Sequence, residues 1–225
     1  MPQRPSVVVF DVNETLSDLS PLADRFADLG VPGSMAKQWF AGLLRDGFAL
    51  TAAGASEKFS VVGESVLRTL LAPEELDRDL DQAVQHVMSG FTALPVHPDV
   101  PDGVRALRDL GLRLVTLTNG STAVAEQLFA KAGLREAFET LLSVDDAGAW
   151  RPDPASYAYA GRTCRVEAAE MLLVAVHPWD IDGASRAGLS TAWVSRDGTD
   201  YPGHFRPPTH TVRALPELAA LLAAG

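Results

Sequence analysis

Cysteine is almost missing from this chain of 225 residues, which contains Cys164 and no other. A single cysteine excludes an intrachain disulfide and a metal cage of cysteine ligands, and such usage is typical of a reducing compartment. The sequence also lacks an apolar run near the roughly 18 residues that a membrane-spanning helix needs. Its first residues, MPQRPS, offer no apolar signal segment. We therefore expect a soluble, cytoplasmic protein that has no membrane partner.

Positive charge is scarce as well. The chain has 19 basic and 29 acidic residues, a formal net charge of −10, and its lysines are Lys37, Lys58 and Lys131. Nucleic-acid binding needs clustered Lys and Arg side chains against the phosphates, so we expect no nucleic-acid partner. A small anionic ligand would need a locally positive pocket.

Five short apolar runs alternate with helical segments. They are VVVF at 7–10, LRLVTLT at 112–118, LLSV at 141–144, LLVAV at 172–176 and TAWV at 191–194. Continuous apolar strands separated by helices are typical of a parallel sheet covered on both faces. Two of the intervening amphipathic segments reach a glycine, the usual helix stop. The pattern predicts a doubly wound, Rossmann-like α/β fold.

Residues 16–95 interrupt this alternation, because they carry helical spacing and no strand-like run. The chain then returns through LPVHPDVPDG, whose prolines and glycine are typical of a connection. We expect a helical cap domain at 16–95, inserted after the first strand. The core domain would then comprise 1–15 and 96–225.

Polar side chains follow four of the predicted strands: Asp11, Thr118 with Asn119, Arg151 and Asp180. In open α/β sheets, ligands bind beyond the carboxyl ends of the strands. A hydroxyl, an amide, a cation and two carboxylates that converge on this edge are the groups an active site uses.

These motifs resemble those of the haloacid dehalogenase superfamily. The first motif is an apolar strand ending in Asp, with Thr four residues later, matched by Asp11 and Thr15. The second ends a strand in Ser or Thr, matched by Thr118 in TLTNGS, and the last acidic motif is matched by Asp180 in WDIDGASRAGL. The resemblance implies a parallel-sheet core with a helical cap, and it makes Asp11 a nucleophile that forms a covalent intermediate.

Two positions indicate whether the nucleophile attacks phosphorus or carbon. Phosphatases of the superfamily have a second Asp two residues after the nucleophile, where this chain has Asn13, which transfers no proton. They also bind magnesium through an acidic residue at the position of Val176, and magnesium needs hard oxygen ligands. The resemblance therefore implies attack on carbon, with no metal and no cofactor.

The sequence resembles the 2-haloacid dehalogenase branch further in TNGS, in RPDPASY and in Trp179 beside Asp180. That branch displaces halide from small 2-haloacids and releases 2-hydroxy acids, inverted at the reacting carbon. Asp180 would activate or position the water that attacks the aspartyl ester. The catalytic residues implied are Asp11, Thr15, Thr118, Arg151 and Asp180.

Some positions differ from that branch. Arg151 stands where a Lys is usual; it keeps the positive charge but has a planar fork and a different reach. In well-studied members an Arg that binds the leaving halide follows a Trp, whereas Phe40 follows Trp39 here, and Arg45 is the alternative cap arginine. We expect substrate contacts from Asn13, Phe40, Arg45, Asn119, Tyr157, His177 and Trp179.

Three alternatives stay open. Opening of a strained ring acid such as azetidine-2-carboxylate would need an acid for the departing amine, for which Glu14 and His177 are candidates. A magnesium-dependent phosphatase would need an altered metal site, for example at Asp182. The fold can also persist in an inactive binding protein. The expected partner is a small carboxylate substrate, and relatives make a homodimer an expectation too.

Overall fold

A computed structural model describes residues 5–224. Residues 1–4, on which the expectation of no signal segment partly rests, lie outside the described residues. The sheet is parallel throughout, in the order β3-β2-β1-β4-β5-β6. Its strands are β1 (Val7–Phe10), β2 (Arg113–Thr118), β3 (Thr140–Ser143), β4 (Met171–Ala175), β5 (Ser190–Val194) and β6 (His210–Val212).

The predicted α/β fold is confirmed, and each of the five predicted strands is found within one residue at both ends. The sixth strand, β6, was missed because its three residues, HTV, form no apolar run. It lies at the edge of the sheet, where it pairs with β5 alone.

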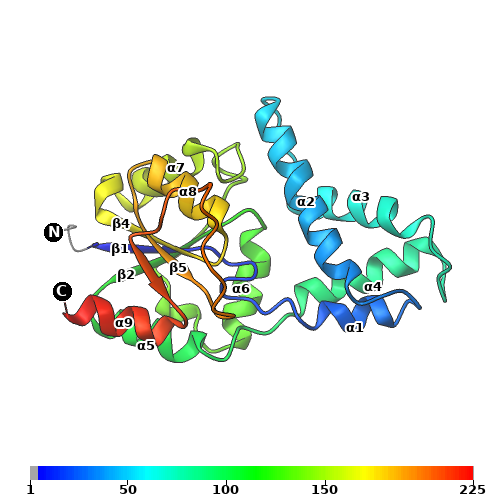
Figure 1. Ribbon diagram of the computed structural model, residues 1–225, viewed down its shortest axis with the longest axis horizontal. Helices are drawn as coiled ribbons and strands as arrows, with labels where there is room; N and C mark the ends of the chain where they lie inside the picture. Colours follow the sequence, from blue (N-terminus) through cyan, green and yellow to red (C-terminus); the bar gives the residue numbers. More distant parts are fainter. Residues whose placement is uncertain (1–4, 225) are drawn as a thin grey trace.

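Helices cover both faces of the sheet (Figure 1). On one side are α5 (Val100–Asp109), α6 (Thr122–Lys131) and α9 (Leu215–Ala224); on the other are α7 (Pro154–Cys164) and α8 (Pro178–Arg186). Two 3₁₀ turns span Arg135–Ala137 and Ala168–Glu170. Successive strand residues face opposite ways, so Val8 and Phe10 pack under α5, α6 and α9. Because Val7 and Val9 are buried on the other side, the run VVVF is apolar without a break.

Four helices follow β1 before the chain enters α5: α1 (Leu22–Ala27), α2 (Met35–Ala52), α3 (Phe59–Leu71) and α4 (Leu80–Thr92). They lie together to one side of the sheet (Figure 1). The outgoing and returning chains meet where Asp18 N donates to Pro95 O at 2.8 Å and Ser17 bridges Val96. On this ground we propose the two-domain division, with the cap at 16–95. None of the described helices is long and apolar enough to cross a membrane.

The order of the strands determines which loops meet. β1 lies between β2 and β4, and all three strands run in the same direction. The residues that follow them therefore emerge side by side at one edge of the sheet, on the side where the cap helices lie (Figure 1).

Candidate active site

Asp11 directly follows β1 and is 2% exposed. Thr15 Oγ1 donates to its Oδ2 at 2.6 Å, and Arg151 Nη2 donates to its Oδ1 at 2.7 Å. The Thr15 hydroxyl is itself fixed, because it accepts from Val176 N at 3.0 Å at the end of β4. Both oxygens of the Asp11 carboxylate are thus held in place before any ligand arrives.

Arg151 joins two buried carboxylates. Its Nη1 donates to Asp180 Oδ2 while its Nη2 donates to Asp11, and the three side chains are at most 2% exposed. Charges buried this deeply are stable only when they are paired and hydrogen-bonded. A guanidinium presents separate N–H groups in a rigid fork, whereas an ammonium is a point charge. This geometry explains how Arg151 pairs with both carboxylates at a position where a Lys is usual.

Asp180 also accepts from the Tyr157 hydroxyl, through Oδ1 at 2.6 Å. Burial raises the pKa of Asp180, and the Asp11 charge raises it further, while Arg151 and Tyr157 oppose the increase. Burial also raises the pKa of Tyr157 well above its ordinary value. The phenol therefore stays protonated and keeps donating. Tyr157, predicted to contact substrate, donates to Asp180 in the structure.

The polar residues after β2 have different surroundings. The Asn119 side chain pairs with the main chain of Arg151, accepting from its N at 3.0 Å and donating to its O at 3.3 Å. It therefore fixes the loop that carries Arg151. Thr118 Oγ1 accepts from Gly120 N at 2.9 Å. Among the described residues the Thr118 hydroxyl donates to no acceptor, so its hydrogen is available to a ligand.

His177 stands between two aromatic rings, with centroids 5.0 Å from Trp179 and 6.3 Å from Phe40. Its Nε2 lies 3.1 Å from Asn13 O and 3.5 Å from Asp11 Oδ2. The cap thus contributes Phe40 to the rings around His177, whose Nε2 lies beside the Asp11 carboxylate. Four of the predicted substrate-contact residues meet here.

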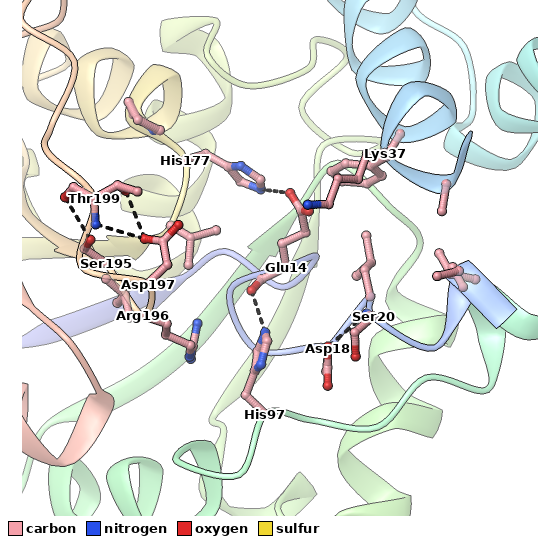
Figure 2. Close-up of a pocket in the computed structure, with 18 of the residues that line it drawn as sticks. Glu14, Asp18, Ser20, Lys37, His97, His177, Ser195, Arg196, Asp197 and Thr199 are labelled. Atoms are coloured by element: carbon pink, nitrogen blue, oxygen red, sulfur yellow. Dashed lines mark hydrogen bonds and ion pairs between the residues drawn. The ribbon is translucent and has the colours of Figure 1, made fainter. Parts of the chain in front are cut away.

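Figure 2 shows Glu14 between His177 and His97. Its carboxylate lies 3.7 Å from His177 Nε2, and its main-chain oxygen accepts from His97 at 2.9 Å. Burial raises the pKa of Glu14, although His177 opposes the increase. These groups, together with Lys37, line an open cavity of about 690 Å³ between core and cap.

A second cavity, of about 90 Å³, lies on the other side of the Asp11 loop. Asn13, Thr118 and Gly120 from the core line it, and the cap contributes apolar walls and one cation. The cap residues include Lys58, Phe59, Met88 and Phe91. We did not predict Lys58 at this cavity, although the scarcity of lysine in this acidic chain makes each lysine a candidate to bind an anion.

Arg45 is not brought to the site. Its side chain is 74% exposed and pairs with the neighbouring Asp46 at 2.8 Å, and it lines neither cavity described above. The positions of Arg45 and Phe48 around helix α2 explain why Arg45 does not reach the site. The side of α2 that faces the core carries Phe48, which contacts Trp179 with ring centroids 4.9 Å apart. Phe48 is a neighbour of the site that we did not predict.

The donor set does not fit a magnesium ion. Among residues 5–224, no group of three or more His, Cys, Asp and Glu side chains is arranged to hold a metal. Asp182, the candidate for an altered site, pairs with Arg186 at 2.6 Å. Val176 offers no side-chain oxygen, while magnesium prefers several hard oxygen ligands.

Comparison with known proteins agrees with this fold. A family model of haloacid dehalogenase-like hydrolases matches residues 5–188, and the chain belongs to this family. It is 28% identical to "Haloacetate dehalogenase H-2" of Moraxella sp. (strain B), over 96% of this chain and 97% of that protein. It is 27% identical to an "(S)-2-haloacid dehalogenase" of Pseudomonas putida, over 94% of both.

A solved structure of the L-2-haloacid dehalogenase from Xanthobacter autotrophicus, with chloropropionic acid covalently bound, superposes with a TM-score of 0.86. The two sequences are 25% identical, and the match covers 97% of this chain and 98% of the other. The similarity therefore extends over the cap as well as the core.

The hydrogen bond from Tyr157 gives a test of the site's electrostatics. Tyr157→Phe removes a donor that stabilises ionised Asp180, so we expect the pKa of Asp180 to rise further. Carbon-13 NMR titration of the aspartate carboxyls measures this, with Asp180→Asn to assign the signal. Tyr159→Phe is the control, because Tyr159 bonds Asp146 instead. An unchanged Asp180 titration in Tyr157→Phe would contradict the arrangement.

Proposed function

We propose that this protein hydrolyses small 2-haloacids to 2-hydroxy acids through an ester on Asp11. The observation that carries the proposal is the Asp11 carboxylate, held through both oxygens by Thr15 and Arg151 with Asp180 beside it. The dehalogenases of Moraxella and Pseudomonas support it. So does the Xanthobacter enzyme, because chloropropionic acid is covalently bound in its structure.

The first half of the reaction is a displacement at carbon. An Asp11 oxygen attacks the carbon that bears the halogen, a C–O bond forms, and the halide departs with the electron pair of the broken bond. The attack comes from the side opposite the halide, so the carbon is inverted. Thr15 and Arg151 orient the nucleophile, and fixed geometry of this kind lowers the entropic cost of the reaction.

The second half regenerates Asp11. Water attacks the carbonyl carbon of the ester and gives a proton to Asp180. The bond between that carbon and the ester oxygen then breaks, and this oxygen, which Asp11 had supplied, takes up a proton and leaves as the hydroxyl of the 2-hydroxy acid. The second proton of the water is released, and Asp11 is again a carboxylate. A carboxylate with a raised pKa is a better base near neutral pH than an ordinary one. The raised pKa of Asp180 suits it to this step.

We propose the smaller cavity as the substrate site. It is lined by Asn13, which follows the nucleophile closely in the chain, and by Thr118, whose hydroxyl hydrogen has no acceptor among the described residues. A volume of about 90 Å³ suits acids of two or three carbons. Lys58, at the cap side of the same cavity, would attract the substrate carboxylate.

Asp11→Asn tests the covalent mechanism. We expect halide release from chloroacetate and 2-chloropropionate, without added metal, to fall at least about 10³-fold. The melting temperature should change little, because Arg151 keeps Asp180 as a partner. Asp146→Asn, at an exposed position, should retain activity. Equal turnover by wild type and Asp11→Asn would rule out Asp11 as the nucleophile.

Variants of the two cap lysines test which of the two cavities binds the substrate. Lys58→Met should raise KM for chloroacetate about two- to fivefold, the range expected for one exposed charge, and leave kcat nearly unchanged. Lys37→Met is matched in chemistry but lines the larger cavity, so its KM should match wild type. The reverse pattern would place the substrate in the larger cavity.

A second candidate activity is the opening of a strained ring acid such as azetidine-2-carboxylate. The contact between Glu14 and His177 favours it, because a departing amine needs a proton and a carboxyl with a raised pKa can supply one. Glu14→Gln should then abolish ring opening and retain halide release from chloroacetate, both followed by product chromatography. Ring opening at the wild-type rate in Glu14→Gln would exclude Glu14 as the acid.

We also propose a cytoplasmic location, which is supported by the single cysteine, Cys164, a free and buried thiol. A homodimer remains a prediction made from the resemblance.

A further inference from the structure

Trp150, in the loop between β3 and α7, belongs to the core by sequence but is bonded to the cap. Its main-chain N donates to Thr51 Oγ1 at 3.1 Å, and its indole Nε1 donates to Glu57 O at 3.0 Å. The ring stacks on Phe59, with centroids 5.7 Å apart and planes at 14°. The residue is 1% exposed, so the cap buries it almost completely.

Gly47 makes this contact possible. It lies in the middle of α2, where glycine costs about 0.5–1 kcal/mol relative to alanine. A Cβ at Gly47 would lie 2.3 Å from both Cε3 and Cζ3 of the Trp150 ring, far inside van der Waals contact. The indole therefore occupies space that any other residue at position 47 would fill.

The next residue in the chain is Arg151. Its main chain is fixed to the core by Asn119, and its side chain joins Asp11 to Asp180. Adjacent Cα atoms are about 3.8 Å apart, so one anchor of this dipeptide is in the cap and the other is in the core. A shift of the cap that moves Trp150 would strain or displace Arg151.

We propose that Trp150 is a positioning residue that couples the seating of the cap to the placement of Arg151 between the two carboxylates. Its kinetic consequence rests on the proposed function. Trp150 acts through Arg151, because none of its contacts is with Asp11 or Asp180. With the cap seated, the loop is bonded to the cap through Trp150 and to the core through Asn119 and Ser156. With the cap lifted, it loses the Trp150 contacts and keeps only its bonds to the core.

The coupling has an electrostatic signature. The groups that face Asp180 are Arg151, Asp11, Tyr157 and His177. Arg151 lowers the pKa of Asp180, against the effects of burial and of Asp11. If Trp150 is pushed out of place and Arg151 follows, Asp180 should titrate at a higher pH than in the wild type.

Gly47→Ala tests the proposal, with Gly42→Ala as the matched control in the same helix. A Cβ at Gly42 would meet only Val66 Cγ1, at 3.0 Å. We expect Gly47→Ala to lower kcat for chloroacetate about tenfold or more, since small misplacements of an active site can cost up to about 10²-fold. KM should change less than about twofold, and the carbon-13 NMR midpoint of Asp180 should rise. Gly42→Ala should leave both kcat and that midpoint as in the wild type.

Thr51→Val provides a second variant that leaves the ring packing intact. It keeps the side-chain shape but removes the hydroxyl that accepts from Trp150 N. It should therefore lower kcat and raise the Asp180 midpoint, each by less than Gly47→Ala does. If Gly47→Ala fails to fold, Thr51→Val decides whether Trp150 positions Arg151.

Wild-type kcat and Asp180 titration in folded Gly47→Ala would overturn the proposal, as would equal changes in Gly42→Ala. The NMR measurement needs no turnover. If the wild-type protein releases no halide, the proposed function fails, while the titrations still decide whether Trp150 positions Arg151.

Discussion

The bridge from Arg151 to Asp11 and Asp180 is the interaction on which the site depends. Two carboxylates at most 2% exposed would repel each other strongly in a medium of low polarity. One guanidinium reaches both, and Thr15 and Tyr157 satisfy the remaining oxygens. The bridge therefore pairs two buried carboxylates at the same place where it orients the nucleophile.

Residues at the ends of neighbouring strands hold Asp11 and Arg151, the two partners in this bridge, in place. The parallel sheet brings the ends of β1 and β4 together, so that Val176 N fixes Thr15 and Thr15 fixes Asp11. Asn119, after β2, fixes the main chain of Arg151. The helices of the proposed cap place Phe40 beside His177 and form one side of the smaller cavity.

The sequence predicted the parts of this arrangement that depend on local pattern. Continuous apolar runs identify strands buried on both faces, and a polar residue at a strand end is placed at the active edge by the topology alone. The sequence did not predict contacts across the cap interface. Arg45 and Phe48 lie on one helix, α2, and only three-dimensional packing decides that Phe48 reaches Trp179 while Arg45 faces solvent. The need for Gly47 likewise follows from an indole 103 residues away in the chain.

The proposed reaction would change the charges around Arg151 between its two halves. In the resting site the Asp11 charge helps to raise the pKa of Asp180. Ester formation neutralises Asp11, and the negative charge leaves with the halide. Arg151 then has Asp180 as its only charged partner among these side chains, and one influence that raised the pKa of Asp180 is gone. Burial, the largest cause of the raised pKa of Asp180, is unchanged by ester formation. Asp180 can therefore be ionised when the ester is present and still be a better base for water than an ordinary carboxylate.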